Sequence, residues 1–127
     1  MTSIYCYCGS DIEFQNCCEP LIKGLHKAAT AEALMRSRYS AYATHEADYL
    51  VASTHISQRK YHTKTEILNW AMTNKWLKLE IINTTENTVE FKAYFLDNVL
   101  KNYIHHELST FIFENGSWFY VDGKFFW

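Results

Sequence analysis

Phe111-Ile-Phe-Glu-Asn-Gly-Ser-Trp-Phe-Tyr120 has the pattern of a β-hairpin, with two hydrophobic runs joined by Asn115-Gly116. Both central residues of a type I′ turn need a positive φ, and Asn-Gly is a dipeptide that strongly favours this turn. A two-residue turn also fixes which residues face each other across the hairpin. We therefore expect Phe111 to pair with Tyr120.

The same register, extended without irregularity, assigns other residues to the two faces of the sheet. It pairs Ser109 with Asp122 and places Glu107 on their face, because side chains alternate sides along a strand. His106 then points to the opposite face. A dyad of His106 and Glu107 would therefore need a β-bulge.

The segments before the hairpin predict two more strands and, before those, three helices. Alternating hydrophobic residues indicate strands over 76–83 and 88–96, with Leu77, Leu79 and Ile81 on one face of the first. A third strand covers 103–114. Helical spacing and the N-cap residues Thr30 and Thr63 indicate helices over 31–44, 46–53 and 63–71. Helices followed by antiparallel strands predict an α+β fold, in which about three helices pack on a curved sheet and form a cone.

All four cysteines lie near the N-terminus, with the spacing Cys6-x-Cys8-x8-Cys17-Cys18. Four thiolates can close a tetrahedral Zn²⁺ site, and such a site is structural because it leaves no position for a catalytic water. Gly9, directly after the first pair, suits the tight turn of a metal-binding knuckle. The spacing predicts one zinc ion bound by the four cysteines.

Two alternatives to a metal site stay open. Four cysteines can also form two disulfides in an oxidising compartment, or act as redox-active thiols. Residues 1–5 have no basic or apolar leader pattern, so we expect a reducing cytoplasm, where metal binding is favoured. Ser10 and Glu13 have the spacing of a capping box and predict a short helix over 11–18 that returns the second cysteine pair to the first.

The composition limits the class of protein. The 127 residues, 48% hydrophobic and 20% charged, allow one globular core with a small appendage. A net charge of −2 argues against a DNA-binding or other nucleic-acid-binding surface, which is normally basic. No apolar run approaches the roughly 18 residues that a membrane span needs.

Two segments resemble a known family. Cys6-Tyr-Cys-Gly-Ser, with Phe14 and Cys17-Cys18, resembles the SEC-C motif, which is named for the zinc segment of the SecA translocation ATPase. Residues 30–42, Thr-Ala-Glu-Ala-Leu-Met-Arg-Ser-Arg-Tyr-Ser-Ala-Tyr, resemble the next helix of YchJ-family proteins. The resemblance implies a zinc knuckle over 1–24 and a nuclear-transport-factor-2-like cone over 25–127, without implying an activity. Departures from the family pattern, none at a cysteine, are Tyr7 for proline, and Asp11 and Glu19 for glycine.

A cone of this type can enclose a pocket. Its candidate lining residues are Arg36, Arg38, Tyr39 and Tyr42 from the first helix, and Tyr94, His106, Glu107, Ser109 and Asp122 from the sheet. We interpret His106 either as a base or ligand contact, or as a core histidine bonded to a backbone group or a tyrosine hydroxyl. Arg38 is expected to pair with Glu107 or Asp122, because a buried arginine needs a partner. The tyrosines and phenylalanines form either core or a stacking surface, and His55, His62 and His105 are expected on the surface.

Three functions are compatible with these patterns. We expect docking of a protein or ribosomal partner through the knuckle, because the resemblance implies a task like that of the SecA segment, which is thought to contact a chaperone and the ribosome. The alternative is a small-molecule enzyme of the isomerase, dehydratase or hydrolase type, or a ligand carrier, using the cone. Nucleic-acid binding is the least favoured. No catalytic residue is assigned, an enzyme is not favoured, and the sequence leaves the oligomeric state open.

Overall fold

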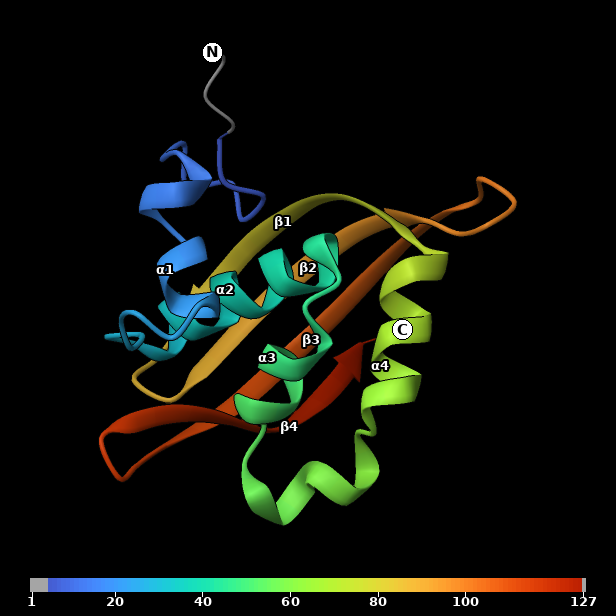
Figure 1. Cartoon of the computed structure of the whole chain (residues 1–127). Helices are drawn as coiled ribbons and strands as arrows, with labels where there is room; N and C mark the ends of the chain where they lie inside the picture. Colours follow the sequence, from blue (N-terminus) through green and yellow to red (C-terminus); the bar gives the residue numbers. More distant parts are fainter. Residues whose placement is uncertain (1–4, 127) are drawn as a thin grey trace.

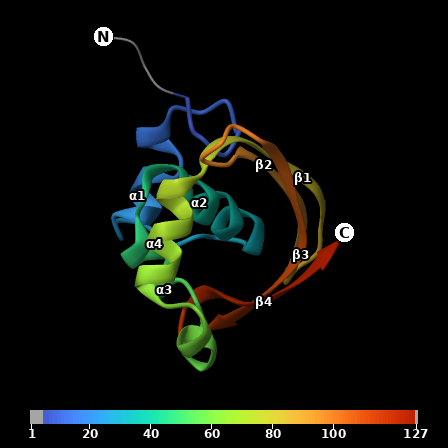
Figure 2. The ribbon, with the colours of Figure 1, turned by 90° about the vertical axis from the view of Figure 1, so that its right-hand side faces the viewer.

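The computed structural model describes residues 5–126 and has the expected α+β fold. A single antiparallel sheet contains four strands in the order β1-β2-β3-β4. Their bounds are Lys75–Thr84 for β1, Thr88–Leu96 for β2, Asn102–Glu114 for β3 and Ser117–Phe126 for β4. The sheet curves around the helices, so that its concave face is covered (Figures 1 and 2).

The helices precede the sheet in the chain. The three expected helices are α2 (Ala31–Thr44), α3 (Ala47–Ala52) and α4 (Lys64–Thr73). The structure adds α1 (Glu19–Ile22) and two 3-10 helices, η1 (Phe14–Asn16) and η2 (Ile56–Tyr61). The central helix is α2, which contacts β1, β2 and β4 as well as its helical neighbours.

Two threonines cap helices as the sequence predicts. The hydroxyl of Thr30 accepts a hydrogen bond from the backbone N–H of Ala33 at 3.0 Å and begins α2. At the start of α4, the Thr63 hydroxyl accepts from the backbone N–H of Glu66 at 3.3 Å and donates to its carboxylate at 3.1 Å. These side chains satisfy N–H groups that have no partner inside the helix.

The hairpin turn forms as predicted, but the register holds only near the turn. Asn115 and Gly116 have φ of 53° and 81°, and Phe111 pairs with Tyr120. A bulge then inserts Val121 into β4, so that Asp122 faces Thr110 and Ser109 faces Gly123. The predicted pairing of Ser109 with Asp122 is therefore wrong, because a bulge lets one strand of a pair bend with the curved sheet.

A second bulge changes the face of one β1 residue. The register shifts between Trp76 and Lys78, which leaves Leu77 as the extra residue. Leu77 is 48% exposed, whereas Leu79 is buried and Trp76 packs against the core. The prediction that Leu77 shares the inner face was therefore wrong, and Trp76 takes its place.

The predicted helix over 11–18 is reduced to the short η1. Ser10 does not cap a helix; its hydroxyl accepts from the backbone N–H of Ile12 at 3.2 Å. Asp11 has a left-handed φ of 63°, which turns the chain before a helix can begin. Gly9, with φ of 83°, makes the tight turn that the sequence predicts.

The N-terminal segment packs directly on the cone. Cys6, Cys8 and Cys18 belong to the same buried cluster as Leu34 of α2 and Val89 of β2. The division at residue 24 stays a prediction, since the two parts share one core. None of the helices between residues 5 and 126 has the length and hydropathy of a membrane-spanning segment.

Candidate functional site

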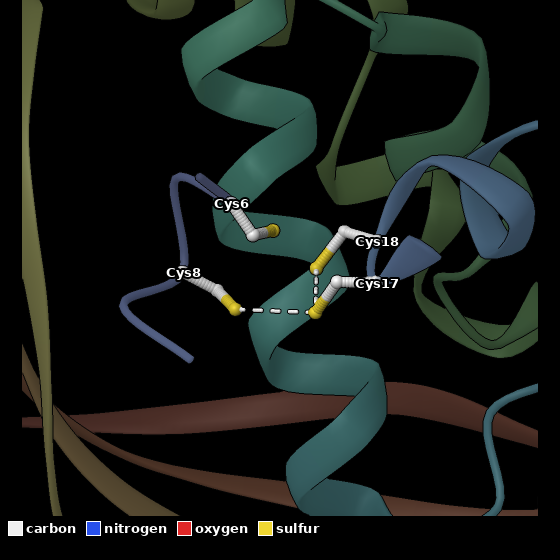
Figure 3. A group of neighbouring side chains, drawn as sticks. All are labelled: Cys6, Cys8, Cys17 and Cys18. Atoms are coloured by element: carbon white, nitrogen blue, oxygen red, sulfur yellow. Dashed lines mark hydrogen bonds between the residues drawn. The ribbon is translucent and has the colours of Figure 1, made fainter. Parts of the chain in front are cut away.

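The four cysteines converge beside α2 (Figure 3). Their Sγ atoms all lie within 4.8 Å of one another, with 3.8 Å between Cys8 and Cys17 and 4.0 Å between Cys17 and Cys18. A tetrahedral zinc ion with Zn–S bonds of about 2.3 Å would hold its sulfurs about 3.8 Å apart. All four thiols are free of disulfides. The donor set and the spacing suit a metal ion, and we call these four residues the cysteine cluster.

Groups around the cysteine cluster attach it to the rest of the fold. Nη1 of Arg36, on α2, donates to the backbone carbonyl of Cys8 at 2.7 Å, and the Ser40 hydroxyl lies 3.5 Å from the sulfur of Cys6. Arg36 was a candidate pocket residue, but the structure places it here. Burial raises the pKa of the Cys17 thiol to about 11. A bound cation would favour the thiolate that a metal ligand requires.

A separate cavity of about 260 Å³ lies between the helices and the concave face of the sheet. Five of the candidate pocket residues line it, namely Arg38, Tyr39, Tyr42, Glu107 and Ser109. The rest of the lining is largely aromatic and consists of Met35, His62, Trp70, Trp76, Phe91, Ala93, His105, Tyr120 and Phe125.

Three sheet candidates lie outside the cavity. The Tyr94 hydroxyl donates to Glu80 at 2.7 Å. His106 points away from the cavity, with Nε2 2.8 Å from Glu90 and its ring stacked on Phe126, so it is neither a pocket base nor a core histidine. Asp122 is exposed because the bulge moves it out of the predicted register.

Two histidines that were expected on the surface line the cavity instead. His105 could have been found from the sequence, because the alternation that places Glu107 and Ser109 inward also places residue 105 inward. His62 follows η2 in a loop, where no periodic signal assigns a face. Burial, reinforced by the positive charge of Arg38, lowers the pKa of His62.

Glu107 is the centre of a buried hydrogen-bond network. Its carboxylate accepts from His105 Nε2 at 2.7 Å, from the Ser109 hydroxyl at 2.5 Å and from the Tyr120 hydroxyl at 3.1 Å. Burial by itself would raise the pKa of Glu107, but the hydrogen bonds from His105 and Ser109 outweigh it, and the pKa is lowered. The carboxylate is therefore ionised and fully engaged.

Gly123 makes room for this carboxylate. It sits opposite Ser109, and a Cβ at this position would overlap the Glu107 side chain. Burial raises the pKa values of the neighbouring phenols of Tyr39, Tyr42 and Tyr120, so these hydroxyls stay protonated and can donate hydrogen bonds.

Arg38 brings a positive charge to the same cavity. It is 5% exposed, and its Nη1 donates to the Leu50 carbonyl at 3.0 Å and to the Ser53 and Thr54 hydroxyls at 2.6 and 3.3 Å. The guanidinium carbon lies 4.6 Å from the centre of the Tyr120 ring. The predicted ion pair with Glu107 or Asp122 is not formed, and in residues 5–126 no carboxylate pairs with Arg38.

Comparison with known proteins assigns the family. The model of the YchJ middle NTF2-like domain matches residues 30–123. The chain belongs to the YchJ family. A UPF0225 protein of Photorhabdus laumondii is 41% identical over 125 residues, covering 93% of this chain and 79% of that protein. A second relative, from Geobacter sulfurreducens, is 39% identical over 130 residues, covering 97% and 80%.

Solved structures support both the fold and the motif. The solution structure of a SEC-C motif containing protein from Rhodopseudomonas palustris matches with a TM-score of 0.87 and 34% identity, covering 95% of this chain and 98% of that one. A crystal structure of a SEC-C motif containing protein from Psychrobacter arcticus matches with a TM-score of 0.80 and 32% identity, covering 96% and 81%. The family resemblance read from the sequence is therefore confirmed.

Proposed function

We propose that the cone of this YchJ-family protein binds a small organic molecule in the cavity beneath α2. One observation carries the proposal: aromatic walls surround the buried charged groups Arg38 and Glu107. A core built only for stability seldom includes such groups, because removing a charge from water is unfavourable. Ligand pockets combine apolar walls with a few polar groups and measure about 300–1,000 Å³. At about 260 Å³, this cavity would accept a small ligand.

We also propose that the cysteine cluster holds one structural Zn²⁺. The support is its four sulfur donors, which suit zinc and leave no position for a substrate. The cluster is attached to α2 through Arg36, and α2 carries Arg38 and Tyr39 into the cavity. In this proposal zinc stabilises the helix that forms one side of the ligand site.

A fragment screen by NMR tests ligand binding. Zinc-loaded protein is titrated with a library of small neutral, cationic and anionic molecules, and the indole N–H signals of Trp70 and Trp76 report binding in the cavity. Ala93→Leu should abolish the shifts, because Ala93 is buried in the lining and the added methyl groups would occupy the cavity. Tyr94→Phe, next in the strand on the outer face, should leave them unchanged. A library without any hit in the cavity, or hits that survive Ala93→Leu, would contradict the proposal.

Partner docking remains a second candidate, and one surface favours it. A groove of about 460 Å³ lies beside the N-terminal segment, between α1 and the β3–β4 hairpin. Ile22 and Trp118 are among its apolar lining residues, and Lys23, His26 and Lys27 outnumber the one acidic residue of the lining, Asp48. An apolar groove with basic residues suits an acidic protein segment or a ribosomal surface.

Cosedimentation with purified ribosomes tests the ribosomal form of this docking role. The expected result is salt-sensitive binding that Lys27→Glu weakens, with Lys75→Glu, an exposed charge reversal on β1, as the matched control. Equal loss of ribosome binding in both variants would indicate a general effect of charge instead of binding at the groove. Binding unaffected by Lys27→Glu would exclude docking of the ribosome at this surface.

A further inference from the structure

We propose that the cavity selects a small carboxylate with a flat apolar body, and that Arg38 is its anion-binding group. This inference rests on the proposed ligand-binding function and names the chemical class of the ligand. Three features carry it: the hydrogen bonding of Arg38, the saturation of Glu107 and the aromatic walls.

Arg38 keeps donors that can reach a ligand. Its recorded hydrogen bonds all come from Nη1 and go to uncharged oxygens of Leu50, Ser53 and Thr54. Nε and Nη2 make none of these bonds, and the residue lines the cavity. The Tyr42 hydroxyl lies within hydrogen-bonding reach of the guanidinium. The remaining donors of the arginine fork match the two oxygens of a carboxylate.

Glu107 does not compete for this role. Its carboxylate oxygens already accept hydrogen bonds from His105, Ser109 and Tyr120. Arg38 also donates to three oxygens and faces the Tyr120 ring, but those oxygens are uncharged, and within residues 5–126 no carboxylate forms an ion pair with it. An anionic ligand would therefore supply what this buried cation lacks, whereas a cationic ligand would be repelled by it.

The remaining lining specifies the body of the ligand. The ring centres of Trp70 and Trp76 lie 4.9 Å apart, and the ring centres of Trp76 and Tyr39 lie 6.1 Å apart. Phe125 and Trp70 line the cavity and are 49% and 39% exposed, which places them at its mouth. Aromatic faces favour planar apolar groups, and the small volume favours a single ring. The hydroxyls of Tyr39 and Tyr42 add donors for the carboxylate.

Isothermal titration with benzoate and its neutral isostere benzamide tests the class. At pH 7 the zinc-loaded protein should bind benzoate about tenfold more tightly or better, which is the size expected for one charge-assisted pair. Arg38→Gln should remove the preference. Arg59→Gln is the matched control, because Arg59 also bonds to backbone carbonyls but does not line the cavity.

The outcomes separate the two proposals. Equal binding of both compounds in the cavity, or cavity binding confined to neutral or cationic fragments, would overturn the carboxylate inference and leave ligand binding intact. A cavity that takes no ligand at all would overturn both. Arg38 also ties α2 to α3, so Arg38→Gln could fail to fold. In that case the comparison of the two compounds on the unaltered protein decides the question.

Discussion

The Glu107 carboxylate can occupy its position because Gly123 has no side chain. The bulge at Val121 moves β4 by one residue, which brings Gly123, instead of Asp122, opposite Ser109. Glu107 then occupies the space that a Cβ would fill. The bulge and the glycine together allow an ionised carboxylate to lie in a β-sheet core with three donors around it.

Gly123→Ala should therefore destabilise the protein through Glu107. We expect a loss of about 1–3 kcal/mol in the free energy of unfolding, the usual cost of overpacking a core. The loss should be smaller when Glu107 is also replaced by alanine, because the overlapping carboxylate is then gone. Urea unfolding of the two single variants and the double variant measures this coupling, and strictly additive losses would show that Gly123 does not act by accommodating Glu107.

The lowered pKa of Glu107 predicts a specific pH dependence. In the unfolded chain this group titrates near its ordinary value of 4.5, and folding lowers its pKa. Its contribution to stability is therefore fully present above pH 4.5 and is lost as the pH falls through the folded pKa. The stability difference between the protein and Glu107→Gln should shrink below pH 4.5. Both proteins carry the same cysteine cluster, so the effect of acid on that cluster is common to both and cancels in the difference. A difference that stays constant down to pH 3 would contradict the assignment.

Single-residue expectations succeeded where the strand was regular. Alternation correctly placed Glu107 and Ser109 on the inner face, and it excludes His106 from that face for the same reason. The predicted position of Asp122 was wrong because no feature of the sequence indicates the bulge at Val121. The hydrogen bonds of Arg38 to α3 were also beyond prediction, since they depend on how two helices pack.

Two segments with the spacing Ser/Thr-x-x-Glu show how tertiary context decides a helix. Thr63 caps α4 as predicted, and the carboxylate of Glu66 accepts a hydrogen bond from the Thr63 hydroxyl. Ser10 and Glu13 have the same spacing, but the Ser10 hydroxyl bonds to Ile12 and lies 3.2 Å from the sulfur of Cys17. The chain between the cysteine pairs must turn back within a few residues, and this requirement outweighs a local preference worth about 1 kcal/mol.

Arg36 should control how firmly the zinc ion that we propose for the cysteine cluster is held on α2. Arg36→Gln removes a charged hydrogen bond of 2.7 Å to the Cys8 carbonyl, and such bonds contribute about 1.5–3 kcal/mol. We expect zinc transfer to a chromogenic chelator to become about tenfold faster or more, because about 1.4 kcal/mol in the barrier to release corresponds to a factor of ten in rate. The control is Glu32→Gln, which breaks the ion pair of Arg36 within the helix and keeps the contact to Cys8. Equal acceleration in both variants would locate the effect in the helix instead.

The cysteine cluster and the cone share a hydrophobic core. Cys8 and Cys18 are fully or almost fully buried, and their cluster includes Phe91 and Phe111 of the sheet. In the sequence the two parts look separate, because all four cysteines lie within residues 6–18. The shared core consists of contacts between distant segments, which the sequence alone does not reveal. Packing of this kind makes the cysteine cluster an integral layer of the fold, next to the helix that carries Arg38.

A shared core predicts one unfolding transition for the whole chain. Zinc-loaded protein is heated with a chromogenic chelator present, and metal release is compared with the loss of sheet circular dichroism and of tryptophan fluorescence. All three should have the same midpoint, because Cys8 cannot move out of the core without exposing the residues packed around α2. Cys17→Ser, at the least buried of the four cysteines, should lower both midpoints together. Tyr7→Phe, at an exposed position between Cys6 and Cys8, is the control and should shift neither. If metal is instead released well below the melting of the sheet, the N-terminal segment folds as an independent unit, and zinc cannot stabilise the side of the cavity formed by α2.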